Sequence, residues 1–104
     1  MTRDRSSVDF SRTAQSHVAA ISKWWLANRA SAPELFADEL TAIVALLETT
    51  PRIGRLYARA SGKPQRRILI GRSGYHVYWQ FDDAARTVTI TAVWHSARGA
   101  GPPV

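Results

Sequence analysis

The chain has 104 residues, which fits a single domain over residues 1–104 and is too short for two. It has no cysteine and only three scattered histidines, so we expect no disulfide, no metal site of the zinc type and no cofactor. No apolar run approaches the roughly 20 residues of a membrane-spanning helix, and residues 1–6 lack the apolar core of a signal peptide. We therefore expect a cytoplasmic protein that does not enter membranes.

The net charge of +6 is concentrated in the second half of the chain. Residues 1–50 carry five basic and six acidic side chains, whereas residues 51–104 carry nine basic and two acidic ones. A basic field of this kind favours a polyanion or an acidic protein as partner, although a basic surface also occurs merely for solubility.

The first predicted elements are a short strand and a helix. Residues 8–10 alternate in polarity as a strand does, and Ser11 follows at the position of a helix N-cap. Apolar residues three and four positions apart predict a helix from Ala14 to about Asn28, with one face formed by Val18, Ile21 and Trp25. Adjacent residues point about 100° apart around a helix, so Trp25 faces the core and Trp24 is a partly exposed candidate interface residue.

A second helix is predicted from residue 31 onwards. Ser31 and Glu34 have the spacing of a capping box, and Pro33 is tolerated in a first helical turn. Residues 49–51 end the helix, and its apolar stripe consists of Phe36, Leu40, Ile43, Val44 and Leu47. The short linker at residues 29–31 predicts an antiparallel helical hairpin whose two stripes face one core.

After Pro51 the apolar period changes to two, which predicts strands at residues 55–59, 65–70, 75–81 and 86–94. Turn residues at 71–74 and 82–85 join the last three strands as an antiparallel meander. One face of this meander is predicted to join the core through Tyr75, Val77, Trp79, Phe81, Val88, Ile90, Ala92 and Trp94.

The predicted fold class is therefore α+β. An N-terminal short strand and an α-helical hairpin pack on one face of a C-terminal antiparallel β-sheet, which makes a two-layer fold. Residues 1–6 and 99–104 have little capacity to pack, so we expect them to be flexible.

Several polar side chains of the second half are candidates for binding. Arg66 and Arg67 point to opposite faces of their strand, and the pattern alone leaves open which of them joins the polar face. Arg98 follows the last strand, where burial offers no reason for an arginine, so contact with a phosphate or a partner is favoured. His76 and His95 each admit two interpretations, a hydrogen-bonded structural histidine or a functional group.

Short segments in a consistent order carry a family resemblance over nearly the whole chain. In the first half they are Trp24-Trp25, Asn28-Arg29, Ala32-Pro33, Leu35-Phe36, Leu46 to Pro51, and Gly54. In the second half they are Arg67 to Ile70, Arg72 to Gly74, Tyr75 to Trp79, and Ala92 to Gly99. In order and spacing, from about residue 7 to residue 103, the chain resembles the RelE/ParE superfamily, the toxins of type II toxin–antitoxin systems.

The resemblance implies the same α-hairpin and meander, and a toxin that inhibits growth. A cognate antitoxin would neutralise it in a hetero-oligomer by laying an extended or helical segment over its surface. ParE-like members poison DNA gyrase, whereas RelE-like members cleave mRNA in the ribosomal A site. A third alternative is a non-toxic basic binding module that has kept only the scaffold.

The resemblance also indicates which candidate residues a RelE-like nuclease would need. For a nuclease, the candidate catalytic residues are Arg67, His76, His95 and Arg98, which would converge on the polar sheet face. By the resemblance, however, a catalytic lysine of RelE-like enzymes corresponds to Leu69 here, and no tyrosine follows Arg98. A YoeB-like set built on His95 also lacks its tyrosine and has only Glu48 as its nearest acid.

These departures favour the ParE-like action on gyrase, with ribosome-dependent mRNA cleavage as the alternative. On either reading, the residues expected to bind the target or a phosphate are Arg67, Arg72 and Arg98. The residues expected at the antitoxin interface are Trp24 and Arg66.

Overall fold

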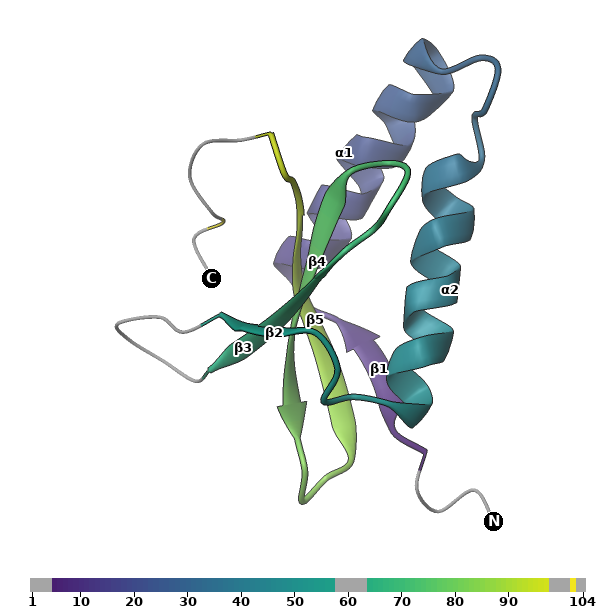
Figure 1. Ribbon diagram of the computed structural model, residues 1–104. Coiled ribbons are helices and arrows are strands. Elements are labelled where there is room, and N and C mark those ends of the chain that lie inside the picture. The colour runs from purple at the N-terminus through teal and green to yellow at the C-terminus, as the bar shows by residue number, and fades with distance from the viewer. Residues whose placement is uncertain (1–4, 58–63, 98–101, 103–104) are drawn as a thin grey trace.

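The computed structural model describes residues 5–57, 64–97 and 102. Two helices and five strands are present in this part of the chain (Figure 1). In chain order they are β1 (Ser7–Phe10), α1 (Arg12–Asn28), α2 (Leu35–Thr49), β2 (Arg55–Tyr57), β3 (Gln65–Leu69), β4 (Tyr75–Asp82) and β5 (Thr87–His95). The helical hairpin, the strands after residue 51 and the meander of the last three are thus confirmed.

The five strands form one sheet in the order β1-β5-β4-β3-β2, and both helices lie on the same side of it (Figure 1). The four later strands pair antiparallel, as predicted. β1 adds to the edge of β5 in parallel, with Ser7 opposite Thr87 and Phe10 opposite Ile90. The sheet is therefore mixed, because the helical hairpin stands between β1 and the meander, and the fold is α+β with two layers.

The start of α1 confirms Ser11 as its N-cap. The Ser11 Oγ accepts a hydrogen bond from the Ala14 backbone N–H at 3.1 Å, and the Ser11 N–H donates to the Ile90 carbonyl at 2.8 Å. The helix begins at Arg12, two residues before the apolar pattern does, because the cap fixes the first turn. It ends at Asn28, as predicted.

The predicted capping box of α2 is wrong. The helix starts at Leu35, with Glu34 at the cap position and no side-chain capping bond. Instead, the Ala32 N–H donates to the Arg29 carbonyl at 3.1 Å, and the Leu35 N–H donates to the Ala32 carbonyl at 3.3 Å. These two turns occupy the residues that a capping box needs in helical conformation, so Ser31 stays in the linker.

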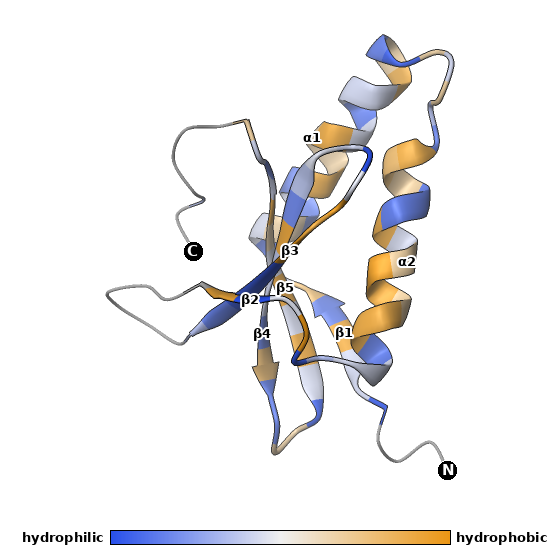
Figure 2. Cartoon of the chain, viewed as in Figure 1, coloured by the Kyte–Doolittle hydropathy of each residue, from blue (hydrophilic) through white to orange (hydrophobic). Residues whose placement is uncertain are grey.

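The core lies between the helices and the sheet, and Figure 2 shows apolar residues along both. Trp25, Phe36, Leu40 and Leu47 contribute from the helices, and the strand contribution includes Val77, Trp79, Val88 and Ile90. Two buried indoles are also hydrogen bonded: Trp79 Nε1 donates to the Pro51 carbonyl at 2.9 Å, and Trp25 Nε1 donates to the Tyr75 hydroxyl at 3.3 Å. These bonds join β4 to α1 and to the segment that follows α2.

An irregularity in β5 overturns part of the predicted core face. Trp79 pairs with Ile90, but Tyr78 pairs with Ala92, so Thr91 is an extra residue in β5. Beyond it the alternation is inverted. Val93, opposite the buried Val77, is the residue that joins the core, whereas Ala92 and Trp94 turn to the other face. The prediction that these two face the core is therefore wrong.

The segment before β1 contacts the end of α2 from Arg5 onwards. The Ser6 N–H donates to the Glu48 carbonyl at 2.7 Å, and Arg5 forms an ion pair with the Glu48 carboxylate at 3.4 Å. Ser6 and Pro102 are both buried. The flexibility predicted for residues 1–6 and 99–104 stays a prediction, and residues 1–4, 99–101 and 103–104 lie outside the described residues. In the described part of the chain, neither helix is long and apolar enough to cross a membrane.

Candidate functional site

The sheet face turned away from the helices, called the outer face below, brings several candidate residues together. Side chains directly opposite each other on paired strands lie on the same face. One row across the strands contains Arg55, Arg67, Tyr78 and Ala92. The next row contains Leu69, His76 and Trp94. In Figure 2 the middle of β3 is among the most hydrophilic stretches of the sheet.

The strand register determines which of the two neighbouring arginines of β3 lies on the outer face. Arg67 lies on the outer face, and its Nη1 donates to the hydroxyl of Tyr78 at 3.4 Å. Arg66 lies on the helix face, opposite Leu56 and Trp79. Arg67 is thus the arginine that joins the polar face. Arg55 joins it from β2. Sequence reasoning missed this residue because the pattern of residues 55–59 does not determine which face each side chain takes.

His76 lies beside this arginine on the outer face. Its ring centroid is 6.0 Å from that of Tyr78, and the exposed Leu69 is its partner on β3. Burial lowers the pKa of His76, and the positive charge of Arg67 lowers it further. His76 is therefore neutral at pH 7. Its ring can donate one hydrogen bond and accept one, but it does not place a second positive charge beside Arg67.

His95 does not join Arg67 and His76. It pairs with Tyr75, on the helix face, and the two rings meet edge to face at 4.9 Å. Its Nδ1 accepts a hydrogen bond from the Ala97 N–H at 3.0 Å, so the neutral ring carries its proton on Nε2. The predicted convergence of His95 with the polar face is thus wrong, because the extra residue Thr91 shifts the alternation of β5. Arg98 lies outside the described residues.

Arg72 lies in the turn between β3 and β4, which is fastened to α2. The Glu39 carboxylate accepts the backbone N–H of Arg72 at 3.1 Å and that of Ser73 at 2.9 Å. Burial alone would raise the pKa of Glu39, but hydrogen bonds from Ser73 and Arg72 and the charge of Arg72 outweigh it and lower the pKa. The sequence analysis did not single out Glu39, because a contact 33 residues away leaves no local pattern.

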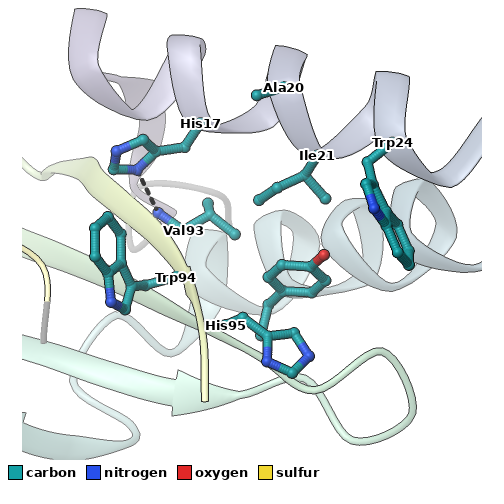
Figure 3. Close-up of a pocket in the computed structure, with 8 residues that line it drawn as sticks. His17, Ala20, Ile21, Trp24, Val93, Trp94 and His95 are labelled. Carbon is teal, nitrogen blue, oxygen red and sulfur yellow. Dashed lines mark hydrogen bonds between the residues drawn. The ribbon is translucent and has the colours of Figure 1, made fainter. Parts of the chain in front are cut away.

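A hollow of about 460 Å³ lies between α1 and the end of β5, lined by His17, Trp24, Tyr75, Trp94 and His95 among others (Figure 3). His17 Nδ1 accepts the Val93 N–H at 3.2 Å, which satisfies a β5 donor beyond the end of β1. Trp24 is 45% exposed and Trp25 only 6%, which confirms the predicted orientation of the two indoles. The Arg29 guanidinium lies 5.4 Å from the Trp24 ring centroid, so the rim of this hollow is both aromatic and basic.

The described residues contain no group of three or more histidine, cysteine or acidic side chains placed to hold a metal ion. Glu48, the nearest acid suggested for a YoeB-like set, pairs with Arg5 instead. The polar side chains in the two described rows of the outer face are therefore arginine, tyrosine and neutral histidine.

Comparison with protein families gives one match over most of the chain. Residues 8–99 match the model described as the ParE toxin of type II toxin–antitoxin system, parDE. No protein with a curated description matches the sequence.

Solved structures of similar fold come from both branches of the superfamily. The chromosomal ParDE system of P. aeruginosa matches with a TM-score of 0.66 and 17% identity, over 88% of this chain and 97% of that chain. The RelBE2 toxin–antitoxin complex of Mycobacterium tuberculosis matches with a TM-score of 0.63 and 24% identity, over 91% and 95%. A mutant of E. coli RelE in the free state matches with a TM-score of 0.57 and 18% identity, over 91% and 87%. At these identities the structures establish the fold alone.

Proposed function

Because this chain belongs to the ParE toxin family of type II toxin–antitoxin systems, we propose that it stops growth by poisoning DNA gyrase in the cytoplasm. The observation that carries the proposal is the composition of the outer face. Leu69 stands, half exposed, where the resemblance places a catalytic lysine of RelE-like enzymes. His95 lies on the opposite face of the sheet, away from Arg67 and His76.

Phosphodiester cleavage needs a proton acceptor and charge stabilisation around one reacting phosphate. With Leu69 in place of the lysine and His95 behind the sheet, two groups of that set are missing from the described outer face. A poison of gyrase needs only a binding surface, since the enzyme that it blocks performs the cleavage. The family match and this incomplete set point in the same direction.

A second candidate function is ribosome-dependent mRNA cleavage, and one observation favours it. Arg67, His76 and Tyr78 do gather on one face, and His76 is neutral at pH 7, as a general base must be. The similarity in fold to E. coli RelE is compatible with this alternative.

We further propose that a cognate antitoxin covers the hollow beside α1. Trp24 gives this surface an exposed indole, and an aromatic anchor at the rim of a hollow is typical of a binding hot spot. The similar structures of RelBE2 and ParDE are toxin–antitoxin systems, which supports such a hetero-oligomer. Arg66, on the same sheet face as the helices, would extend the interface towards β2.

The proposed function is tested by inducing the chain in cells and by adding it to purified gyrase with supercoiled plasmid. We expect growth arrest with DNA-damage signalling, and linear plasmid that accumulates only when gyrase and the toxin are both present. His76→Ala should leave this cleavage within about twofold, whereas a nuclease would lose about a hundredfold in rate.

Two results would contradict the gyrase proposal. Transcripts cut on the ribosome, without any linear plasmid, would support the mRNA endonuclease instead. Normal growth and intact DNA and mRNA would leave only the non-toxic binding module.

A further inference from the structure

Two arginines stand side by side on the outer face. Arg55 of β2 and Arg67 of β3 are direct partners in antiparallel strands, so their side chains start from Cα atoms about 5 Å apart. Like charges in this position destabilise a sheet. The arginine pair, Arg55 and Arg67, is therefore better explained by an anion that it binds than by a contribution to the fold.

The pair is partly held in place before any ligand arrives. Tyr78 is only 1% exposed, and its hydroxyl accepts a hydrogen bond from Arg67 Nη1 at 3.4 Å. Arg55, in contrast, is exposed at the edge of the sheet. The guanidinium of Arg67 is thus held by a buried phenol, and that of Arg55 is accessible. This arrangement would allow both planar guanidinium groups to donate hydrogen bonds to one phosphate group.

Among the described residues, negative charge lies away from the pair. Most described acidic residues are on or beside α2, in the helical layer, or in the β4–β5 turn. On the outer face the acidic positions are Asp9, opposite Thr89, and Asp82, opposite Thr87, both at the far end of β5 from Ala92. The ion pairs among described residues engage Arg5, Arg52 and Arg86. Among the described residues, the charges around Arg55 are therefore predominantly positive.

We propose that the outer face binds the phosphodiester backbone of a DNA strand, with the arginine pair closing on a phosphate. The inference rests on the proposed action on gyrase, an enzyme that works on DNA. An acidic protein surface is the less suitable ligand, because stable protein interfaces have an apolar centre and the exposed apolar residue of these two rows is Leu69. Interfaces with DNA are more polar and strongly basic.

The test is fluorescence anisotropy with a labelled 16-nucleotide DNA strand, the same sequence as RNA, and the DNA duplex. We expect Arg55→Ala and Arg67→Ala each to weaken DNA binding about tenfold and to lower the slope of log affinity against log salt by about one. Arg12→Ala, an exposed arginine at the start of α1, is the matched control and should stay within about twofold. Because Arg55 is exposed, its variant should fold even if the Arg67 variant does not.

The DNA site is overturned if the unaltered chain binds no DNA, if Arg55→Ala binds like the control, or if RNA binds more than about tenfold tighter than DNA. The gyrase assay separates this inference from the function on which it rests. Gyrase poisoning that persists without any DNA binding by the toxin removes the DNA site and keeps the proposed function. DNA binding through the arginine pair without gyrase poisoning keeps the site and removes the proposed function.

Discussion

At the scale of single residues, Gly54 shows how closely the chain approaches itself beside the outer arginines. Its φ of +80° is a conformation that other residues adopt at a cost, and a Cβ would stand 2.5 Å from the Arg67 carbonyl oxygen. We expect Gly54→Ala to lower the free energy of unfolding by about 2 kcal/mol or more. At Gly71 a Cβ meets no atom within 4 Å, so Gly71→Ala should change stability by less than about 0.5 kcal/mol. Urea unfolding followed by tryptophan fluorescence checks both, and equal midpoints would contradict the close approach.

Single residues also mark what the sequence can and cannot predict. The orientations of Trp24 and Trp25 were predictable because they depend only on the helical period, which neighbouring residues report. The orientation of Trp94 was not, because one extra residue at Thr91 inverts the alternation and leaves no mark on the apolar pattern. The same inversion removed His95 from the candidate site. The position of Arg67 needed the register of β3, which the residues of that strand left open.

At the scale of elements, the tie between α2 and the β3–β4 turn predicts a pH dependence. The pKa of Glu39 lies below its ordinary value of 4.5, so its charged form stabilises the fold fully above that pH and loses this effect as the pH falls through the lowered pKa. Glu39→Gln should therefore unfold at lower urea concentration at pH 7, and the difference should shrink as the pH falls below 4.5. Glu34→Gln, at an exposed carboxylate that makes no capping bond, is the control. A difference that is independent of pH would contradict the assignment.

Element boundaries were also predictable where a neighbouring residue determines them, and not where a distant contact does. The Ser11 cap lies next to the helix that it starts, and it was predicted correctly. Ser31 and Glu34 have the residue types and the spacing of a capping box, but they do not form one. The residues between them are needed in the turns that lead the chain from α1 to α2. The parallel pairing of β1 was also missed as a sheet contact, since its partner is about 80 residues away.

At the scale of the whole molecule, the strand order predicts a gradient of local stability. Within the described residues, β4 and β5 are each paired on both sides, whereas β2 pairs with β3 alone, along three residues. We expect the backbone amides of Val77, Trp79 and Ile90 to exchange hydrogen at rates set by global unfolding, and those of Arg55 and Leu56 much faster. Hydrogen exchange followed by NMR checks this, and equally slow exchange in β2 would contradict it. Arg55 would then belong to a rigid strand rather than to an adaptable edge.

The parallel pairing of β1 with β5 has a consequence for synthesis of the protein. Ser7 leaves the ribosome 80 residues before its neighbour Thr87, so the sheet stays unclosed while the helical hairpin and three strands are made. Contacts so distant along the chain form late and slowly. A nascent chain therefore lacks a complete outer face, and the hollow beside α1, until the last strand emerges.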